Sequence, residues 1–261
     1  MKIIIIGMGN VGQHLASKLV QEGHQLLQCY NRSPLSTDTL EADWKNVLTD
    51  DWKQLRSDAE LVILSVADDA IFETSKALPN SLQNNALVVH TSGFFGREVL
   101  APEIKQKGIF YPLNSFTKGS SIDWDHTPMF LTASEPYIQW LRTLAESFSK
   151  EIYEVDEKQK AILHIAAVMV NNFTNALFTM ADDLLKENQM DLKPLLPLIE
   201  TTFQKIKQMP PRKAQTGPAI RNDQETISKH IQLLKEHPLQ KELYQLLTNY
   251  INPKASEHEN R

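Results

Sequence analysis

The sequence predicts an α/β fold in which a doubly wound, mostly parallel sheet is followed by a smaller all-α domain. Short apolar runs alternate with helical or irregular links up to about residue 155, a pattern typical of parallel strands joined by crossover connections. From residue 156 onward only helical patterns follow. We therefore expect one domain over residues 1–155, a helical domain over residues 156–252, and a frayed tail over residues 253–261.

The expected elements follow one another along the chain. Apolar runs predict strands at Lys2–Ile6, Gln25–Tyr30, Leu61–Val66, Ala86–His90, Gly108–Tyr111, Met129–Thr132 and Glu151–Val155. Helical patterns predict the longer helices at about residues 136–148, 157–188, 193–208, 224–236 and 240–250. We also expect Asp68 and Asp69 to cap a helix after the third strand, and the segment from Trp44 to Trp52 to contribute a short element with a buried aromatic residue.

A glycine pattern connects the first strand to the first helix. Gly7, Gly9 and Gly12 form a GxGxxG motif directly after a run of four isoleucines. In a dinucleotide-binding turn, the first glycine permits the tight turn, the second lets the backbone approach a pyrophosphate, and the third lets the helix lie close to the strand. A glycine-rich turn without a ligand is the alternative. The context predicts a Rossmann domain, with Asn10 and Val11 joining the three glycines at the cofactor.

The end of the second strand indicates which dinucleotide is bound. An NAD-binding fold places an acidic residue there, on the ribose hydroxyls, but this chain has Asn31, Arg32 and Ser33. A guanidinium group can pair in a fork with a 2′-phosphate and stack on the adenine, whereas a carboxylate would repel the phosphate. The segment therefore predicts NADP as the cofactor. The alternative is that Arg32 is a solvated loop residue.

Small and polar residues follow the next strands, at the sheet edge where open parallel sheets bind ligands. We expect Val66, Ala67 and Thr91 to contact the cofactor, and the hydroxyl of Ser92 to reach a substrate oxygen. The alternative for Thr91 and Ser92 is a role in helix capping or in a turn. His90 is expected to be a satisfied residue at the end of its strand.

The long helix from about residue 157 carries a second set of candidate residues. At 100° per residue, Lys160, His164, Asn171 and Asn175 fall within roughly 40° of one line, and Asp182 continues it. A narrow polar stripe on an apolar helix needs polar partners, which favours an active-site cleft. The alternative is a hydrogen-bonded interface between domains or subunits.

Apolar residues surround most of the same helix between Ile162 and Met180. We expect this helix to be buried on several sides, partly against a second copy of the chain, and so predict a homodimer. Further along, Arg221 stands in a stiff turn before a helix that Asp223 can cap. Arg221 can clamp a substrate carboxylate, or it can brace the loop against an Asp.

Composition narrows the class of protein. The net charge of −5 and the absence of a basic cluster argue against nucleic acid as a partner. Cys29 is the single cysteine and is expected in the core, which suits a reducing compartment. We see no signal peptide, no metal site and no apolar stretch near the length of a membrane span, and so expect a cytoplasmic protein with no membrane partner.

Together the motifs GMGNVG, NRS, HTSG, YPLNSF, LHIAAVMVNNF and TGPAIRND resemble a group of bacterial Rossmann proteins over nearly the whole chain. These carry a helical C-terminal domain of unknown function and are described as NADP oxidoreductases. The layout is more distantly similar to deazaflavin-dependent NADP oxidoreductases, pyrroline-carboxylate reductases, ketopantoate reductases and β-hydroxyacid dehydrogenases. The resemblance implies a nicotinamide at the carboxyl edge of the sheet. The catalytic lysine and asparagine of β-hydroxyacid dehydrogenases, one helical turn apart, have no counterpart in the long helix.

We therefore expect an NADP-dependent reductase or dehydrogenase acting on a small, anionic carbonyl, imine or hydroxy compound. His164 is the candidate general acid, because histidine side chains titrate near neutrality. Asn171 and Ser92 would orient the substrate oxygen, and Lys160 would tune the histidine or help to polarise the carbonyl. Arg221 and Asn175 are the candidate substrate-binding residues in the helical domain. The alternative function is a non-catalytic NADP-binding module that reports nucleotide state to a protein partner.

Overall fold

The computed structural model describes residues 1–33 and 42–253. The chain forms two compact units, Met1–Asn172 and Phe173–Arg261. The expected domain boundary near residue 155 follows the last strand of the sheet, whereas the compact units divide within the long helix. A frayed tail was expected over residues 253–261, and of these only Pro253 is among the described residues.

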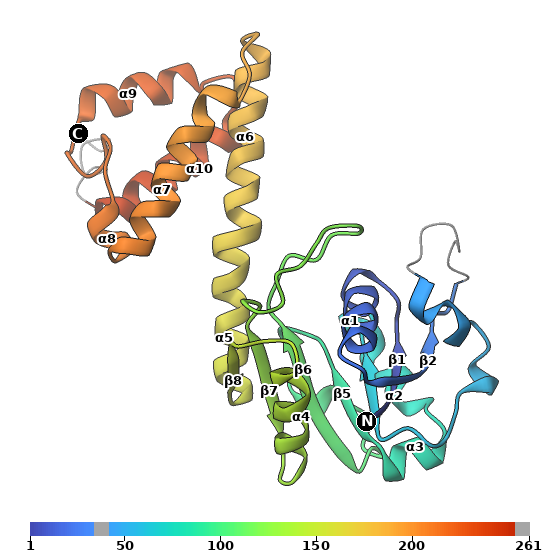
Figure 1. Cartoon of the computed structure of the whole chain (residues 1–261). Helices are drawn as coiled ribbons and strands as arrows, with labels where there is room; N and C mark the ends of the chain where they lie inside the picture. The colour runs from blue at the N-terminus through green and yellow to red at the C-terminus, as the bar shows by residue number, and fades with distance from the viewer. Residues whose placement is uncertain (34–41, 254–261) are drawn as a thin grey trace. The chain divides into compact units, whose positions relative to one another are not determined.

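The first unit is built on an eight-stranded sheet with the order β3-β2-β1-β4-β5-β6-β7-β8 (Figure 1). The strands are β1 (Lys2–Ile6), β2 (Gln25–Tyr30), β3 (Leu48–Thr49), β4 (Leu61–Leu64), β5 (Leu87–His90), β6 (Gln106–Pro112), β7 (Met129–Ala133) and β8 (Ile152–Glu154). All neighbouring strands are parallel except β6 and β7, which are antiparallel. No helix connects these two strands, and a parallel pair needs such a crossover. The predicted α/β fold is confirmed.

Alternating side chains of β1 build the core on both faces of the sheet. Ile3 and Ile5 join the apolar cluster of one face, and Ile4 and Ile6 join the cluster of the other face. Successive residues of a strand point to opposite faces, so a strand covered on both sides is apolar throughout. The covering helices are α1 (Asn10–Gln21) and α4 (Tyr137–Glu146) on the first face, and α2 (Ile71–Lys76) and α3 (Asn80–Asn85) on the second.

Several smaller expectations are tested by this unit. Trp44 is buried in a short helical segment, Ala42–Val47, and Cys29 is buried in β2, as predicted. The capping role expected for Asp68 and Asp69 is wrong. The short helix Asp68–Ala70 begins after Ala67, and α2 begins after Ala70, in both cases without a side-chain hydrogen bond to the cap.

The long helix consists of α5 (Glu157–Val168), a π-helical segment (Met169–Phe173) and α6 (Thr174–Glu187). We expected this helix to be buried on several sides, but within the described residues many of its apolar side chains are exposed. Ile162, Val170 and Phe173 are 61%, 74% and 58% exposed. The expectation that no apolar stretch approaches a membrane span is also wrong, because Glu157–Glu187 is long and apolar enough by length and composition.

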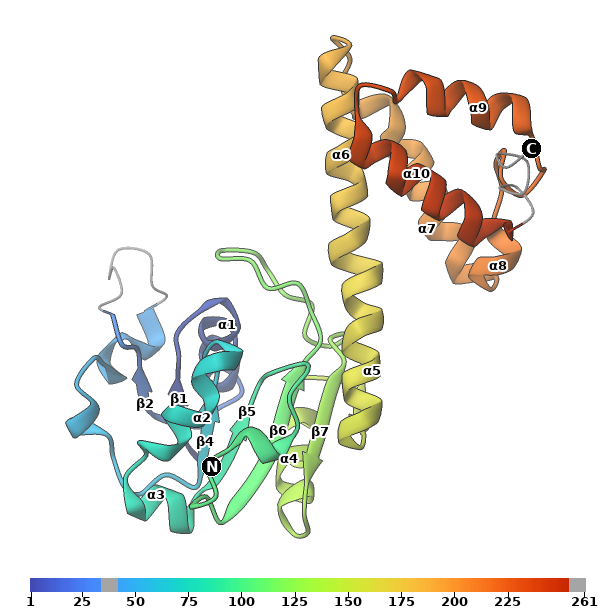
Figure 2. The same ribbon diagram turned by 180° about the vertical axis from the view of Figure 1, so that it is seen from behind.

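The second unit is helical. After α6 come α7 (Leu196–Gln208), α8 (Pro211–Ala214), α9 (Gln224–Leu233) and α10 (Pro238–Ile251), which gather beside α6 in both views (Figures 1 and 2). Asp223 caps α9 as predicted, since its side chain accepts a hydrogen bond from the backbone N–H of Thr226 at 3.1 Å.

Candidate active site at the carboxyl edge of the sheet

The glycine turn after β1 leaves an open, uncapped helix N-terminus. Gly7 has a φ of +95°, and a Cβ atom on Gly7 would lie 2.3 Å from the carbonyl oxygen of Ser65. A Cβ atom on Gly12 would lie 2.0 Å from the carbonyl oxygen of Gly7, whereas one on Gly9 would meet nothing within 4 Å. Helix α1 has no side-chain cap and no acidic residue in its first turn. Its free N–H groups and positive dipole end suit an anion in the open space at Gly9.

A cleft of about 570 Å³ extends from this turn along the ends of β1, β2 and β4. Of the residues expected at the cofactor, those that line the cleft are Gly7, Gly9, Asn31, Arg32, Val66 and Ala67. The others lie outside its lining and are Asn10, Val11, Gly12, Ser33 and Thr91. The cleft therefore joins the turn that would hold a pyrophosphate to the loop that carries the arginine.

Asn31 and Arg32 have different roles at the cleft. The Asn31 side chain accepts a hydrogen bond from the backbone N–H of Met8 at 3.0 Å and donates one to the carbonyl oxygen of Ser33 at 2.7 Å. It thus braces the glycine turn. Arg32 is exposed and makes no ion pair within residues 1–33 and 42–253. Its guanidinium group is therefore available to an anionic ligand.

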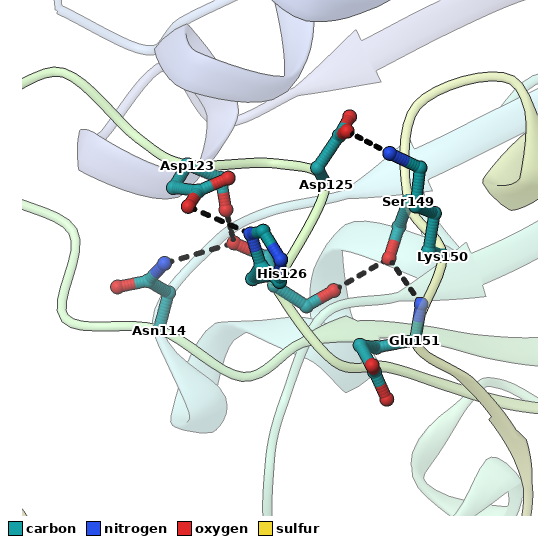
Figure 3. A network of polar contacts seen from close by, with 8 residues as sticks. Asn114, Asp123, Asp125, His126, Ser149, Lys150 and Glu151 are labelled. Carbon is teal, nitrogen blue, oxygen red and sulfur yellow. Dashed lines mark hydrogen bonds and ion pairs between the residues drawn. The ribbon is translucent and has the colours of Figure 1, made fainter.

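The loop between β6 and β7 is anchored at its base by a polar network, shown in Figure 3. Asn114 donates to the hydroxyl of Thr127 at 2.9 Å, and Ser149 donates to the carbonyl oxygen of Thr127 at 2.8 Å. Asp125 forms an ion pair with Lys150. These contacts tie the two ends of the loop together and fix its second end to the segment that leads into β8.

The same loop contacts the first turns of α1. The Asn10 side chain donates to the carbonyl oxygen of Phe116 at 3.0 Å. The two ring nitrogens of His14 lie 2.7 Å and 3.0 Å from the carbonyl oxygens of Asn10 and Ser120. The loop is therefore held beside the helix end that faces the cleft. The Asn10 side chain is used in this contact.

Helix α5 brings two polar side chains to the loop after β5. A capping box fixes its start, because Asp156 accepts from the N–H of Gln159 at 2.7 Å and Gln159 accepts from that of Asp156 at 3.1 Å. One turn later, fully buried Lys160 donates to the carbonyl oxygens of Ser92 at 2.9 Å and Gly93 at 2.8 Å. Burial lowers the pKa of Lys160 to about 8. Lys160 thus holds the loop and is shielded from direct contact with a substrate.

His164 lies one further turn along α5 and meets a tyrosine of β6. Its Nδ1 atom lies 3.2 Å from the hydroxyl oxygen of Tyr111, with ring centroids 6.0 Å apart. A Cβ atom on Gly93 would lie 2.2 Å from this Nδ1 atom and 2.8 Å from Cζ of Tyr111, so only glycine fits between them. Burial, and to a lesser extent the charge of Asp68, raises the pKa of Tyr111 to about 12. We assigned Tyr111 no role from the sequence, although its place at a strand end was visible.

The HTSG segment is held by its own hydrogen bonds. The hydroxyl of Ser92 accepts from the backbone N–H groups of Phe94 and Phe95, each at 3.2 Å, which is the turn role considered as the alternative. His90 is fully buried and satisfied, as predicted. Its Nδ1 accepts from the N–H of Ser92 at 3.2 Å, and its Nε2 donates to the carbonyl oxygen of Gly96 at 3.1 Å. Burial lowers the pKa of His90 to about 4.

The polar stripe expected along the long helix does not continue past His164. The π-helical segment Met169–Phe173 lies between His164 and Asn175 and changes the rotation per residue, so a projection at 100° fails there. Asn171 and Asn175 are exposed, and Asn175 belongs to the helical unit. Arg221 belongs to that unit as well, where its Nη2 lies 4.0 Å from a carboxylate oxygen of Asp223.

Comparisons with known proteins agree with this architecture. Residues 1–114 match a Rossmann-like domain, and residues 127–251 match a domain of unknown function, DUF2520. A protein from Bacteroides fragilis described as a "putative NADP oxidoreductase" is 32% identical, with a TM-score of 0.85 over 97% of this chain and 98% of that one. An imine reductase from Myxococcus stipitatus in complex with NADP+ has a similar fold, with 14% identity and a TM-score of 0.65 over 98% of this chain and 95% of that one.

A curated relative is also similar over part of its length. The oxidoreductase YfjR of Bacillus subtilis, described as uncharacterized, is 27% identical over 178 residues, which make up 66% of this chain and 61% of that protein. The fold and the glycine turn are those of a Rossmann-like oxidoreductase. The chain belongs to the same family as the Bacteroides fragilis protein, which confirms the resemblance inferred from the motifs.

Proposed function

We propose that this protein is an NADP-dependent reductase or dehydrogenase that transfers a hydride to or from a small carbonyl, imine or hydroxy compound. One observation carries the proposal: a single cleft joins an uncapped glycine turn to Arg32 in the loop after β2, an arginine that makes no ion pair within the described residues. The family relationship to a protein described as an NADP oxidoreductase supports it.

The chain's own residues fit a dinucleotide with a 2′-phosphate. The open space at Gly9 and the free N–H groups of α1 would hold the pyrophosphate. Arg32 would pair with the 2′-phosphate at the other end of the cleft, beside the edge-on aromatic pair of Tyr30 and Trp52. The cofactor contacts expected from Asn10, Val11, Gly12, Ser33 and Thr91 would be made from outside the lining of the cleft.

The catalytic end of the site is proposed at the loop after β5. Leu64 of β4 pairs with His90 of β5, so the loops that follow these two strands are neighbours. When bound, the nicotinamide supplies the hydride acceptor or donor. His164 would give a proton to the substrate oxygen or nitrogen during reduction, since its ring reaches the same sheet edge. Lys160 would position the loop beneath it through the carbonyl oxygens of Ser92 and Gly93.

Four further residues are proposed to bind or orient the substrate. The Ser92 hydroxyl keeps its hydrogen available for a substrate oxygen, because its two contacts use the oxygen as acceptor. Asn171 would orient the substrate from the π-helical segment that follows α5. Asn175 and Arg221 remain candidate substrate-binding residues of the helical unit, and the guanidinium group of Arg221 can pair with an anionic group such as a carboxylate.

We also propose a cytoplasmic homodimer. The long helix exposes apolar side chains that a second copy of the chain would cover. The single cysteine, Cys29, is buried and reduced, which suits a reducing compartment. In the same helix, Lys160 contacts the loop after β5 and His164 contacts Tyr111 of β6. These contacts favour a helix that packs on the sheet rather than one that spans a membrane.

The direct test is a screen for NADPH oxidation over a library of small carbonyl and imine compounds. Activity on at least one class, lost in an Arg32→Asp variant at the same NADPH concentration, is the expected result. Tight NADPH binding without oxidation by any compound would instead favour the non-catalytic nucleotide-binding module.

A further inference from the structure

The contact between Tyr111 and His164 has a fixed geometry on both sides. Tyr111 lies at the carboxyl end of β6, in an apolar cluster with Ile109 and Phe130. The hydroxyl oxygen lies 3.2 Å from Nδ1 of His164, and the absence of a Cβ atom at Gly93 lets the two rings approach. The contact therefore selects one nitrogen of the imidazole and leaves the other, Nε2, for a different partner.

The hydroxyl group of Tyr111 has one hydrogen-bond acceptor within the described residues. Burial raises the pKa of Tyr111 to about 12, so the hydroxyl keeps its hydrogen at neutral pH. Within residues 1–33 and 42–253, Nδ1 of His164 is the only hydrogen-bond partner of this hydroxyl. If Nδ1 of the neutral ring carried the hydrogen instead, the buried hydroxyl would have no acceptor, which is unfavourable.

Nε2 of His164 has no hydrogen-bond partner in the described part of the chain, and the ring is partly exposed. We propose that Tyr111 is a positioning residue: its hydroxyl donates to Nδ1 of neutral His164 and thereby keeps the ring hydrogen on Nε2, facing the substrate. In the imidazolium form, Nε2 carries a hydrogen as well, and the Tyr111 oxygen can accept from Nδ1. Nε2 is then a hydrogen-bond donor in both protonation states.

This inference rests on the proposed function for the role of Nε2, but the tautomer can be measured without turnover. Nitrogen-15 NMR of the full chain with labelled histidine, with His164→Gln used to assign the signal, reports which nitrogen is protonated. We expect the Nε2–H tautomer alone for the neutral ring in the wild type. A Tyr111→Phe variant should show a detectable Nδ1–H fraction. An Nδ1–H tautomer in the wild type, or identical populations in the two proteins, would overturn the inference.

A matched control separates this role from the loss of any tyrosine hydroxyl. Tyr153 lies on β8, and its hydroxyl donates to the side chain of Glu151, away from His164. Tyr153→Phe should leave the His164 tautomer unchanged. Both variants should keep the thermal midpoint of the wild type within a few degrees and bind NADPH as it does.

Turnover gives a second, pH-dependent readout. Neutral His164 in Tyr111→Phe can present a bare Nε2, which accepts rather than donates, whereas the imidazolium cannot. The ratio of variant to wild-type kcat should therefore fall as the pH rises, with KM for NADPH unchanged. The ratio also controls for two charged groups near Tyr111: Lys160 on α5, whose Nζ atom lies 5.8 Å from the centroid of the Tyr111 ring, and Asp68 after β4, whose charge acts on both Lys160 and Tyr111.

A constant ratio with an altered tautomer would show that Nε2 is not the donor and would count against the proposed role of His164. A constant ratio with an unaltered tautomer would overturn the inference about Tyr111 and leave the proposed function standing.

Discussion

At the scale of single residues, His164 has the most specific task in the proposed chemistry. Replacement by Gln keeps its approximate size and some hydrogen bonding but removes the imidazole, the candidate proton donor. We expect NADPH affinity to survive in His164→Gln, and turnover on the identified substrate to fall by roughly 10² to 10⁴, the usual contribution of a positioned general acid. Steady-state kinetics checks this. Unchanged activity together with a large loss of thermal stability would make His164 a packing residue.

His90 predicts how the fold responds to acid. Its pKa is lowered to about 4 in the folded protein from an ordinary value of 6.5, because burial penalises the imidazolium. The unfolded chain therefore binds more protons between these values, and stability present above about pH 6.5 is lost as the pH falls toward 4. The loss from this one group is roughly 3 kcal/mol, at about 1.4 kcal/mol for each pKa unit.

Urea unfolding at a series of pH values tests this prediction, with His90→Gln as the comparison. Glutamine retains an acceptor for the N–H of Ser92 and a donor for the carbonyl oxygen of Gly96. The variant should lose less free energy of unfolding than the wild type between pH 6.5 and 4. Equal slopes in the two proteins would mean that His90 is protonated in the folded state without penalty.

At the scale of elements, the apolar patterns predicted the bounds of strands correctly where the conformation depends on residues that are close in the sequence. Strands β1 and β2 have the predicted bounds, because short, mostly apolar runs that end at Gly or at polar residues favour strands. The capping of α9 by Asp223 was likewise visible, since the capping side chain and the backbone N–H that donates to it are three residues apart. The two-residue strand β3 was not predicted, because its pairing with β2 depends on tertiary contact rather than on a local pattern.

The long helix shows where sequence periodicity stops being informative. A projection at constant rotation groups Lys160, His164, Asn171 and Asn175. A π-helical segment intervenes, however, and within the described residues only Lys160 and His164 contact the strands of the sheet or the loops that follow them. Such a segment has no composition that identifies it in advance. Tyr111 was missed for a different reason: its partner is 53 residues away, and no local pattern records that distance.

At the scale of the whole molecule, the exposed apolar helix predicts a homodimer. Val170 is 74% exposed, more than the other apolar residues of the long helix, so a charge there should weaken association with a second copy. Light scattering at micromolar concentration should give twice the chain mass for the wild type and a lower mass for Val170→Asp. Asn85→Asp adds the same charge at an exposed position of α3 and should leave the mass unchanged. A monomeric wild type would contradict the homodimer.

The central claim, that the cleft binds NADP, is tested most directly by calorimetric titration of NADPH and NADH into wild-type and Arg32→Asp protein. Arg32 is unpaired within the described residues, so the substitution removes a partner of the 2′-phosphate and adds a repelling carboxylate. The wild type should bind NADPH more tightly than NADH. The variant should lose a few kcal/mol of NADPH binding, roughly the value of a charge-assisted pair plus the new repulsion, while NADH binding changes little. Equal losses for both nucleotides, or no preference for NADPH in the wild type, would contradict the assignment of NADP.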